Sequence, residues 1–282
     1  MRPRVLLIGD EKKGEVARLV ADLVPWLRQH AEVADVLLRR DEPITVEADY
    51  CVVLGGDGSI LSAARRLRGR QIPTLGVNLG RLGFLARLTV DEDRTALQAV
   101  LLRALRGEMR EEPRMMLECA SPEDGTTVLV LNDVVVQRDE PSLIQVSVRV
   151  AGIDVTTYVG DGVILATPVG STAYSLAAGG PIVAPQVDAL VLTPLASHAL
   201  PVRPLVIPAG GEVEFVVGGE RPHSGRLILD GQVSFGLSGG QRVVARRSDI
   251  QFRSLRLESD DFFQVLRRKF GWQGFPRYDA GL

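Results

Sequence analysis

Four Asp-Gly pairs occur in the sequence, and one of them stands where a carboxylate could take part in chemistry. Asp57 lies in the segment Gly55-Gly56-Asp57-Gly58-Ser59, directly after the apolar run Tyr50–Leu54 and directly before a helical pattern. Ligands of open α/β sheets bind at the carboxyl ends of strands, and bare N–H groups at a helix N-terminus suit phosphate oxygens. A carboxylate repels phosphate, so we expect Asp57 to act there as a metal ligand or a proton acceptor.

Two better-known phosphate-binding motifs do not fit this segment. The pattern G-x-x-x-x-G-K-[ST] occurs nowhere in the chain, which excludes a P-loop nucleotidase. The run that begins at Gly56 lacks the third glycine of G-x-G-x-x-G, which disfavours a hydride-transfer dinucleotide site.

The two asparagines of the chain, Asn78 and Asn132, both lie in segments that resemble motifs. Asn78 belongs to the glycine-rich segment Gly76–Leu85, whose simpler interpretation is a loop that packs Phe84 and Leu85. Asn132-Asp133 closes an apolar run, and Asn132 can offer both a donor and an acceptor to an adenine edge. An ordinary Asn/Asp turn is the alternative for this pair.

A third segment, Gly160–Pro181, combines small residues with hydroxyl side chains. Small residues let a flat ring lie against the backbone, and Thr172, Tyr174 and Ser175 supply hydroxyl groups. Asp161 can accept hydrogen bonds from ribose hydroxyls or from an amide.

Taken together, these segments resemble the NAD kinases. Gly55–Ser59 is similar to the GGDG signature that NAD kinases share with diacylglycerol-type lipid kinases and, more distantly, phosphofructokinases, whereas Gly160–Pro181 is similar to a signature of NAD kinases alone. The resemblance runs from about Val52 to Trp272 and includes Asp230-Gly231-Gln232. The chain departs from the family at Asp133, where NAD kinases carry the longer Glu.

The resemblance implies a reaction and a set of residues. ATP would phosphorylate the 2′-hydroxyl of the adenosine ribose of NAD, with Asp57 as the catalytic proton acceptor and Mg²⁺ or another divalent cation as cofactor. The implied donor-phosphate loop is Gly55, Gly56, Gly58 and Ser59, and the implied NAD-binding residues are Asp57, Gly58, Asn132, Asp133, Asp161, Thr172, Ala173, Tyr174, Ser175, Leu176, Ala177, Ala196 and Gln232. The family also implies a homodimer or homotetramer. The sequence identifies neither metal ligands nor the choice between ATP and polyphosphate or between NAD and NADH.

The elements that must position these residues follow two patterns. Up to about residue 110, strands and helices alternate, with strands at Val5–Ile8, Val33–Leu38, Tyr50–Leu54 and Thr74–Val77 and helices at Glu15–His30, after an N-cap at Ser59 and after Asp91. Such alternation predicts a parallel sheet covered by helices. Beyond it, alternating runs at Ile144–Val150, Val213–Val217, Arg226–Leu229 and Val243–Arg246 predict a β-rich half, and a short amphipathic helix is expected in the tail.

The predicted fold class is therefore an N-terminal Rossmann-like α/β domain followed by a β-rich, sandwich-like domain. The expected boundaries are 1–110 for the α/β domain with the GGDG loop, 111–252 for the β-rich NAD-binding domain and 253–282 for a C-terminal tail. The resemblance implies that this tail packs back on the first domain.

Other charged or reactive residues have simpler interpretations. Arg65 and Arg66 could reach donor phosphates, but a solvated helix face is favoured, and Glu111-Glu112 is expected to be a solvated run at a domain boundary. Cys51 and Cys119 lie far apart in apolar runs, which indicates buried free thiols.

Composition limits the class of protein further. The 282 residues carry 45% hydrophobic and 24% charged residues with a net charge of −2, so we expect no dedicated nucleic-acid binding. The N-terminal apolar run is too short for a signal peptide, and no apolar stretch has the length of a membrane span. We therefore expect a cytoplasmic protein that does not act at a membrane.

Two other functions stay open at this point. A lipid or sugar kinase could share only the glycine loop, although the segment Asp161–Pro181 disfavours this. A non-catalytic sensor of NAD(H) could retain the fold, but such a sensor would have no need of Asp57 as a base.

Overall fold

The computed structural model describes residues 2–39, 42–80, 82–89, 94–139, 142–198, 201–218, 225–258 and 261–272. Its first part alternates strands and helices: β1 (Arg4–Ile8), α1 (Gly14–His30), β2 (Glu32–Leu37), β3 (Tyr50–Leu54), α2 (Asp57–Leu67), β4 (Thr74–Asn78), β5 (Leu88–Thr89) and α3 (Arg94–Leu105). These strands pair in parallel, which confirms the predicted α/β part. Asp91, the expected start of the third helix, lies outside the described residues.

The second part consists mainly of strands. They are β6 (Arg110–Ala120), β7 (Thr127–Val130), β8 (Asp133–Arg138), β9 (Ile144–Val150), β10 (Ile153–Gly160), β11 (Gly162–Ala166), β12 (Ala189–Leu195), β13 (Leu205–Pro208), β14 (Val213–Val217), β15 (Gly225–Leu229), β16 (Val233–Leu237) and β17 (Arg242–Arg256). The helical turns η1 (Gly170–Thr172) and α4 (Tyr174–Ala177) follow β11, and α5 (Phe262–Phe270) follows β17. This strand-rich half confirms the predicted fold class.

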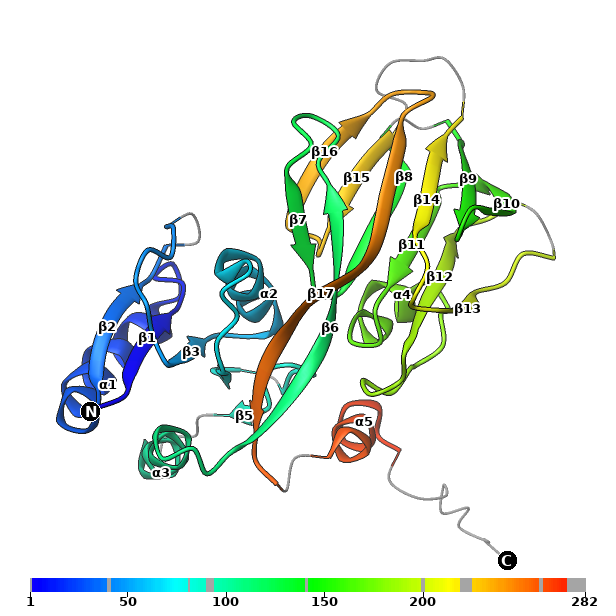
Figure 1. The fold of residues 1–282 in the computed structure, drawn as a ribbon. Helices are drawn as coiled ribbons and strands as arrows, with labels where there is room; N and C mark the ends of the chain where they lie inside the picture. Colours follow the sequence, from blue (N-terminus) through cyan, green and yellow to red (C-terminus); the bar gives the residue numbers. More distant parts are fainter. Residues whose placement is uncertain are drawn as a thin grey trace, which may run out of the picture.

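Two sheets contain all of these strands. One is eleven-stranded, with β10-β9-β14-β17-β4-β3-β1-β2 as its main order, and the other is six-stranded and antiparallel, in the order β13-β12-β11-β8-β15-β16. The strand predicted at Val243–Arg246 is part of the much longer β17, which pairs with β6 along most of its length, with β14 at its beginning and with β4 near its end. Figure 1 shows β6 and β17 as a long pair that joins the helical part to the strand-rich part.

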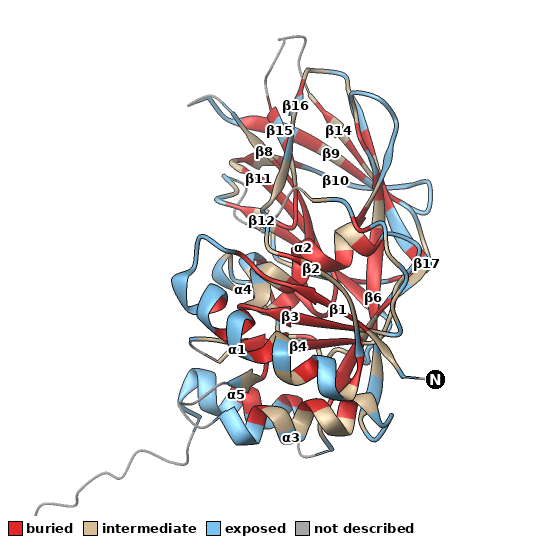
Figure 2. Cartoon of the chain, turned by 90° about the vertical axis from the view of Figure 1, so that its left-hand side faces the viewer, coloured by how far each residue is buried: buried red, intermediate tan, exposed pale blue. Residues whose placement is uncertain are grey.

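Alternating side chains of the parallel strands supply two separate cores. Val5 and Leu7 of β1 pack with α1 and α3, whereas Leu6 and Ile8 pack with α2 on the opposite face. This is the two-residue alternation expected of a strand that is buried on both faces. In Figure 2 these strands are buried, while α1 and α3 expose their outward faces. The core around α2 also includes Met116 and Phe252 from the strand-rich half, so the two halves share packing.

The tail helix α5 lies against the first half, as expected. The ring of Phe270 lies 6.1 Å from that of Phe84, and the Lys269 Nζ lies 4.3 Å from the Phe84 ring centroid. Asp261 caps the helix by accepting a hydrogen bond from the Phe263 N–H at 2.8 Å. The remainder of the predicted tail, residues 273–282, lies outside the described residues, and the domain boundaries stay a prediction.

The Glu111-Glu112 prediction is wrong for Glu112. Its side chain is only 13% exposed and forms an ion pair with Arg114, whose side chain is 2% exposed. The run lies on β6, and pairing of β6 with β17 places Glu112 beside Arg256 as well. Glu111 is more exposed and pairs with Arg253.

Candidate active site

The glycine-rich turn connects β3 directly to α2. The Gly55 N–H donates to the Val77 carbonyl at 2.8 Å, and a Cβ on Gly55, whose φ is 147°, would lie 2.3 Å from the Ser59 Oγ. We expected Ser59 to cap the helix, but the helix begins at Asp57 with Gly56 as N-cap. N–H groups at the start of a helix lack intrahelical acceptors, and this helix starts just after the carboxyl end of β3.

Asp57 is fixed by a second loop. Its Oδ2 accepts the Phe84 N–H at 2.9 Å, and its Oδ1 accepts the N–H groups of Leu85 and Ala86 at 3.0 and 2.9 Å. A carboxylate has about four acceptor positions, so the three bonds seen among the described residues leave one, on Oδ2. A Cβ on Gly83 would lie 2.0 Å from Oδ1, so this glycine is what lets the loop approach the carboxylate.

Asn78 orders the same loop from its other end. Its Oδ1 accepts the Gly80 N–H at 2.9 Å, and its Nδ2 donates to the Ala86 carbonyl at 3.4 Å. The segment Gly76–Leu85 therefore has a more specific role than the packing of Phe84 and Leu85: together with Ala86, which follows it directly, it supplies the backbone donors that hold Asp57.

Gln232 links the strand-rich half to this turn. Its Nε2 donates to the Gly58 carbonyl at 2.7 Å, and its Oε1 accepts from the Arg65 Nη1 at 3.0 Å. The predicted solvated face is thus wrong for Arg65, which is half-buried. Burial lowers the pKa of the Arg65 guanidinium, and the negative charge of Asp230 acts in the opposite direction.

Asn132 and Asp133 lie where β7 passes into β8. A Cβ on Gly170 would lie 2.0 Å from the Asn132 carbonyl oxygen, so the segment Gly160–Pro181 packs directly on Asn132. The Asn132 Oδ1 is buried and has no hydrogen-bond partner within the described part of the chain. The Asp133 side chain is also buried, and burial, together with the charge of Asp230, raises its pKa from 3.8 to about 7.

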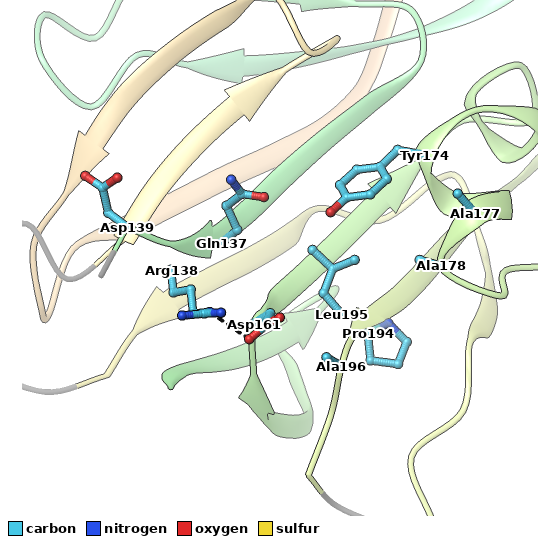
Figure 3. Close-up of a pocket in the computed structure, with 10 residues that line it drawn as sticks. All are labelled: Gln137, Arg138, Asp139, Asp161, Tyr174, Ala177, Ala178, Pro194, Leu195 and Ala196. Carbon is cyan, nitrogen blue, oxygen red and sulfur yellow. Dashed lines mark ion pairs between the residues drawn. The ribbon is translucent and has the colours of Figure 1, made fainter. Parts of the chain in front are cut away.

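A separate pocket of about 680 Å³ lies at the other end of β8. It brings together four predicted residues, Asp161, Tyr174, Ala177 and Ala196, with Gln137, Arg138, Asp139, Ala178, Pro194 and Leu195 (Figure 3). The Asp161 Oδ1 forms an ion pair with the Arg138 Nε at 2.7 Å. Nothing in the sequence pattern pointed to Arg138.

Backbone conformation at this pocket is unusual. Ala196 has a φ of 43°, in the left-handed region that residues with a Cβ rarely adopt. Gly160 permits the close approach of this segment, because a Cβ there would lie 2.8 Å from the Ala196 carbonyl oxygen. Strained backbone that persists at a cavity is typical of functional sites.

The remaining residues of the third motif turn their hydroxyl groups inward. The Thr172 Oγ1 donates to the Val169 carbonyl at 3.0 Å, and the buried Ser175 Oγ lies 2.7 Å from the Thr193 Oγ1. Ala173 and Leu176, which belong to the same segment, are half-buried. None of these four lines the pocket of Figure 3, and their contact with a ligand stays a prediction.

The described residues hold no cluster of three or more His, Cys, Asp or Glu that could bind a metal ion. No helix within them is long and apolar enough to cross a membrane. Cys51 and Cys119 are buried and free, as predicted, and burial raises the pKa of each thiol to about 12.

Comparison with known proteins adds independent findings. Residues 8–107 match the family model of the ATP-NAD kinase N-terminal domain, and residues 131–257 match that of the ATP-NAD kinase C-terminal domain. The chain is 43% identical to an NAD kinase of Gemmatimonas aurantiaca over 248 residues, which is 86% of this chain and 83% of that relative. It is 40% identical to an NAD kinase of Heliobacterium modesticaldum over 281 residues, or 94% and 96% of the two chains.

Solved structures share the fold. An NAD kinase from Archaeoglobus fulgidus in complex with ATP superposes with a TM-score of 0.75 at 27% identity and covers 95% of this chain and 97% of its own. A yeast NADH kinase complexed with NADH gives a TM-score of 0.80 at 24% identity, with 99% and 90% covered.

Proposed function

The chain belongs to the ATP-NAD kinase family, and from this we propose that it transfers the γ-phosphoryl group of ATP to the 2′-hydroxyl of the adenosine ribose of NAD, giving NADP. The observation that carries the assignment to this chain's own residues is the state of Asp57. Its carboxylate stands at the N-terminus of α2, is fixed by three backbone N–H groups and retains one acceptor position.

In the proposed mechanism the acceptor hydroxyl donates its hydrogen bond to that remaining position on Oδ2. As the hydroxyl oxygen attacks the γ-phosphorus, Asp57 takes the proton, and the bond between the phosphorus and the bridging oxygen of ADP breaks. Because the three N–H groups prevent the carboxylate from rotating, the base meets each substrate in one orientation.

The donor enters as MgATP. The N–H groups of Gly56 and Gly58, at the start of α2, are offered to its phosphates, whereas the Gly55 N–H bonds the Val77 carbonyl and Gly55 serves by letting the phosphates come close to the backbone. Within the described residues the chain offers no acidic cluster for a metal, which suits a cation that phosphate oxygens and water hold. We propose Mg²⁺ for this role.

The dinucleotide lies along β8 in this proposal. From Asp133 to Arg138 the strand advances about 17 Å at 3.3 Å per residue. The Asn132-Asp133 end and the pocket end of β8 are therefore separated by about the length of an extended ligand. The unpartnered Asn132 Oδ1 suits the amino group of adenine, an N–H donor that leaves no charge buried. Asp161, Tyr174, Ala177 and Ala196 then receive the remainder of NAD.

We also propose that the chain acts in the cytoplasm as a homodimer or homotetramer. Two edge strands carry exposed apolar side chains, with Ile153 on β10 71% exposed and Val206 on β13 49% exposed. A second copy could cover such edges. Light scattering on the purified chain tests this, and a monomer at working concentration would refute it.

The experiment that tests the function is formation of NADP from NAD, ATP and Mg²⁺ by the full chain. Polyphosphate in place of ATP and NADH in place of NAD then define donor and acceptor. Calorimetry with NAD alone gives binding independently of turnover. Binding without product from any donor and acceptor would refute the kinase and favour an NAD sensor.

Asp57→Asn tests whether Asp57 acts as the base. The amide NH₂ would replace one carboxylate oxygen and face a backbone N–H, so this variant also disturbs the loop at 84–86. We expect kcat to fall by about 10² or more while the Kd for NAD stays within about threefold. Turnover close to that of the wild type would rule out Asp57 as the base.

A further inference from the structure

Asp230 makes a set of contacts that the proposed reaction does not use directly. Its Oδ1 accepts the N–H groups of Asn132 and Asp133 at 2.6 and 3.3 Å, and its Oδ2 accepts the Leu131 N–H at 3.0 Å. Its own N–H donates to the Asp133 carbonyl at 3.0 Å. One side chain thus fixes three consecutive peptide groups of the segment that leads into β8.

This carboxylate is costly where it stands. Asp230 is 7% exposed, and within the described residues no Arg, Lys or His forms an ion pair with it. Burial raises its pKa, and the three N–H groups and the charge of Arg65 act in the opposite direction. Its backbone also adopts a φ of 52°. Asp-Gly suits a hairpin turn with positive φ, so the turn accounts for the backbone, whereas the burial of a carboxylate that forms no ion pair within the described residues indicates a role other than stability.

The turn that begins at Asp230 also contacts α2, the helix that begins with Asp57. Gln232, two residues further on, donates to the Gly58 carbonyl at 2.7 Å and accepts from Arg65 of α2. Residues 230–232 therefore touch both the Asn132-Asp133 segment and the turn that carries Asp57.

We propose that Asp230 is a positioning residue for the acceptor nucleotide, which holds Asn132 and Asp133 at a fixed separation from Asp57. The inference rests on the proposed NAD kinase activity. Asp230 does not touch substrate: it fixes the peptide groups of Asn132, so that the Asn132 Oδ1 meets adenine in one orientation. Gln232 then sets the same turn against Gly58, so that the ribose hydroxyl arrives at Asp57.

Asp230→Asn is the test variant. The amide can still accept from Asn132 and Asp133 through Oδ1, but its NH₂ would face the Leu131 N–H, a contact between two donors. We expect kcat/KM for NAD to fall about 10²-fold, the scale of a misplacement of about 1 Å, while KM for ATP changes less than about twofold. The matched control is Asp124→Asn, the same exchange in another Asp-Gly turn, whose exposed carboxylate bonds Thr126 and Ser121 and none of the proposed site residues within the described part of the chain.

A second variant separates positioning from folding. In an Asn132→Ala background, Asp230→Asn should lower kcat/KM for NAD by less than about threefold further, because the group that it positions is gone. A merely structural role would instead lower kcat in proportion to the folded fraction, with KM for NAD unchanged and an undiminished effect in that background. Either that pattern or wild-type kinetics in Asp230→Asn would overturn the proposal.

Calorimetry keeps this inference distinct from the proposed function. The Kd for NAD should rise in Asp230→Asn and stay unchanged in Asp124→Asn, and neither measurement needs turnover. If the wild type bound NAD but formed no NADP, the kinase assignment would fail while this binding comparison would still decide the role of Asp230. Equal Kd values in Asp230→Asn and the wild type would refute that role.

Discussion

Replacing Gly83 by alanine should displace the carboxylate of Asp57, the proposed base, without removing it. The new Cβ would lie 2.0 Å from the Asp57 Oδ1 and 2.8 Å from its Cγ, and it would also lie 3.1 Å from the Ala86 carbonyl oxygen. The two distances to Asp57 are shorter than any real contact of a Cβ, and the one to Ala86 is tight, so the carboxylate must move away. Gly83 has no positive φ, so alanine adds no backbone strain of its own.

The size of the effect follows from the bonds that Oδ1 would lose. It accepts the N–H groups of Leu85 and Ala86, and a hydrogen bond to a charged group contributes about 1.5–3 kcal/mol. Loss of both sets an upper limit of about 6 kcal/mol. Water can replace part of this, so we expect about 3 kcal/mol, or a thermal midpoint lower by about 6 °C. A base displaced by about 1 Å should lower kcat about 10²-fold.

The assay compares Gly83→Ala with Gly80→Ala, a glycine of the same loop. Among the described residues, a Cβ on Gly80 would have only the Asn78 Oδ1 near it, at 3.9 Å, so this control should keep wild-type kcat and stability. Initial rates of NADP formation and thermal unfolding are measured for both. Wild-type kcat in Gly83→Ala would refute the argument that this loop orients Asp57, and an equal loss in Gly80→Ala would show that any loop change has the same effect.

Three further perturbations test the surroundings of the site. The pKa of Asp133 is raised to about 7 in the folded chain, so the folded state binds the extra proton and stability should fall as pH rises from about 4 to 7. Asp133→Asn should remove this dependence, and equal pH slopes of the unfolding free energy for variant and wild type would contradict it. Gly170→Ala should destabilise the chain by about 3 kcal/mol or more, since its Cβ would meet the Asn132 backbone oxygen at 2.0 Å. Urea unfolding measures this loss, and an unchanged midpoint would refute that packing. Asp161→Asn should raise KM for NAD about tenfold but change stability by less than about 1 kcal/mol, because its ion pair with Arg138 is 41% and 35% exposed, and an unchanged KM would remove Asp161 from the binding site.

The sequence predicted the framework of the fold because local residue patterns indicate most helices and strands. Two-residue alternation along Ile144–Val150 and helical spacing along Glu15–His30 both correspond to elements of the structure. Long-range pairing was less accessible. Nothing local to Val243–Arg246 shows that its strand continues to Arg256 and joins both halves, because that length depends on β6 and β4 as partners.

The candidate site was predictable to the extent that side chains carry it. The GGDG turn, Asp161 and Tyr174 followed from residue type and spacing, whereas Ala177 and Ala196 followed only from the resemblance to NAD kinases. What could not be predicted is the interaction that fixes Asp57, because its donors are peptide N–H groups that every residue except proline has. Arg65 was misjudged for a related reason, since its partner, Gln232, is 167 residues away in the chain.

Asp57 and Asp230 are held in the same manner. Each accepts three backbone N–H groups, and within the described residues neither forms an ion pair with an arginine or lysine. A fixed cation beside Asp57 would attract the phosphates of ATP and would compete for the carboxylate that must take the proton. Peptide dipoles orient an acid without placing a full positive charge beside it. The motif glycines follow from this arrangement, because at Gly83 only a residue without a Cβ lets the backbone come close enough to the carboxylate to hold it.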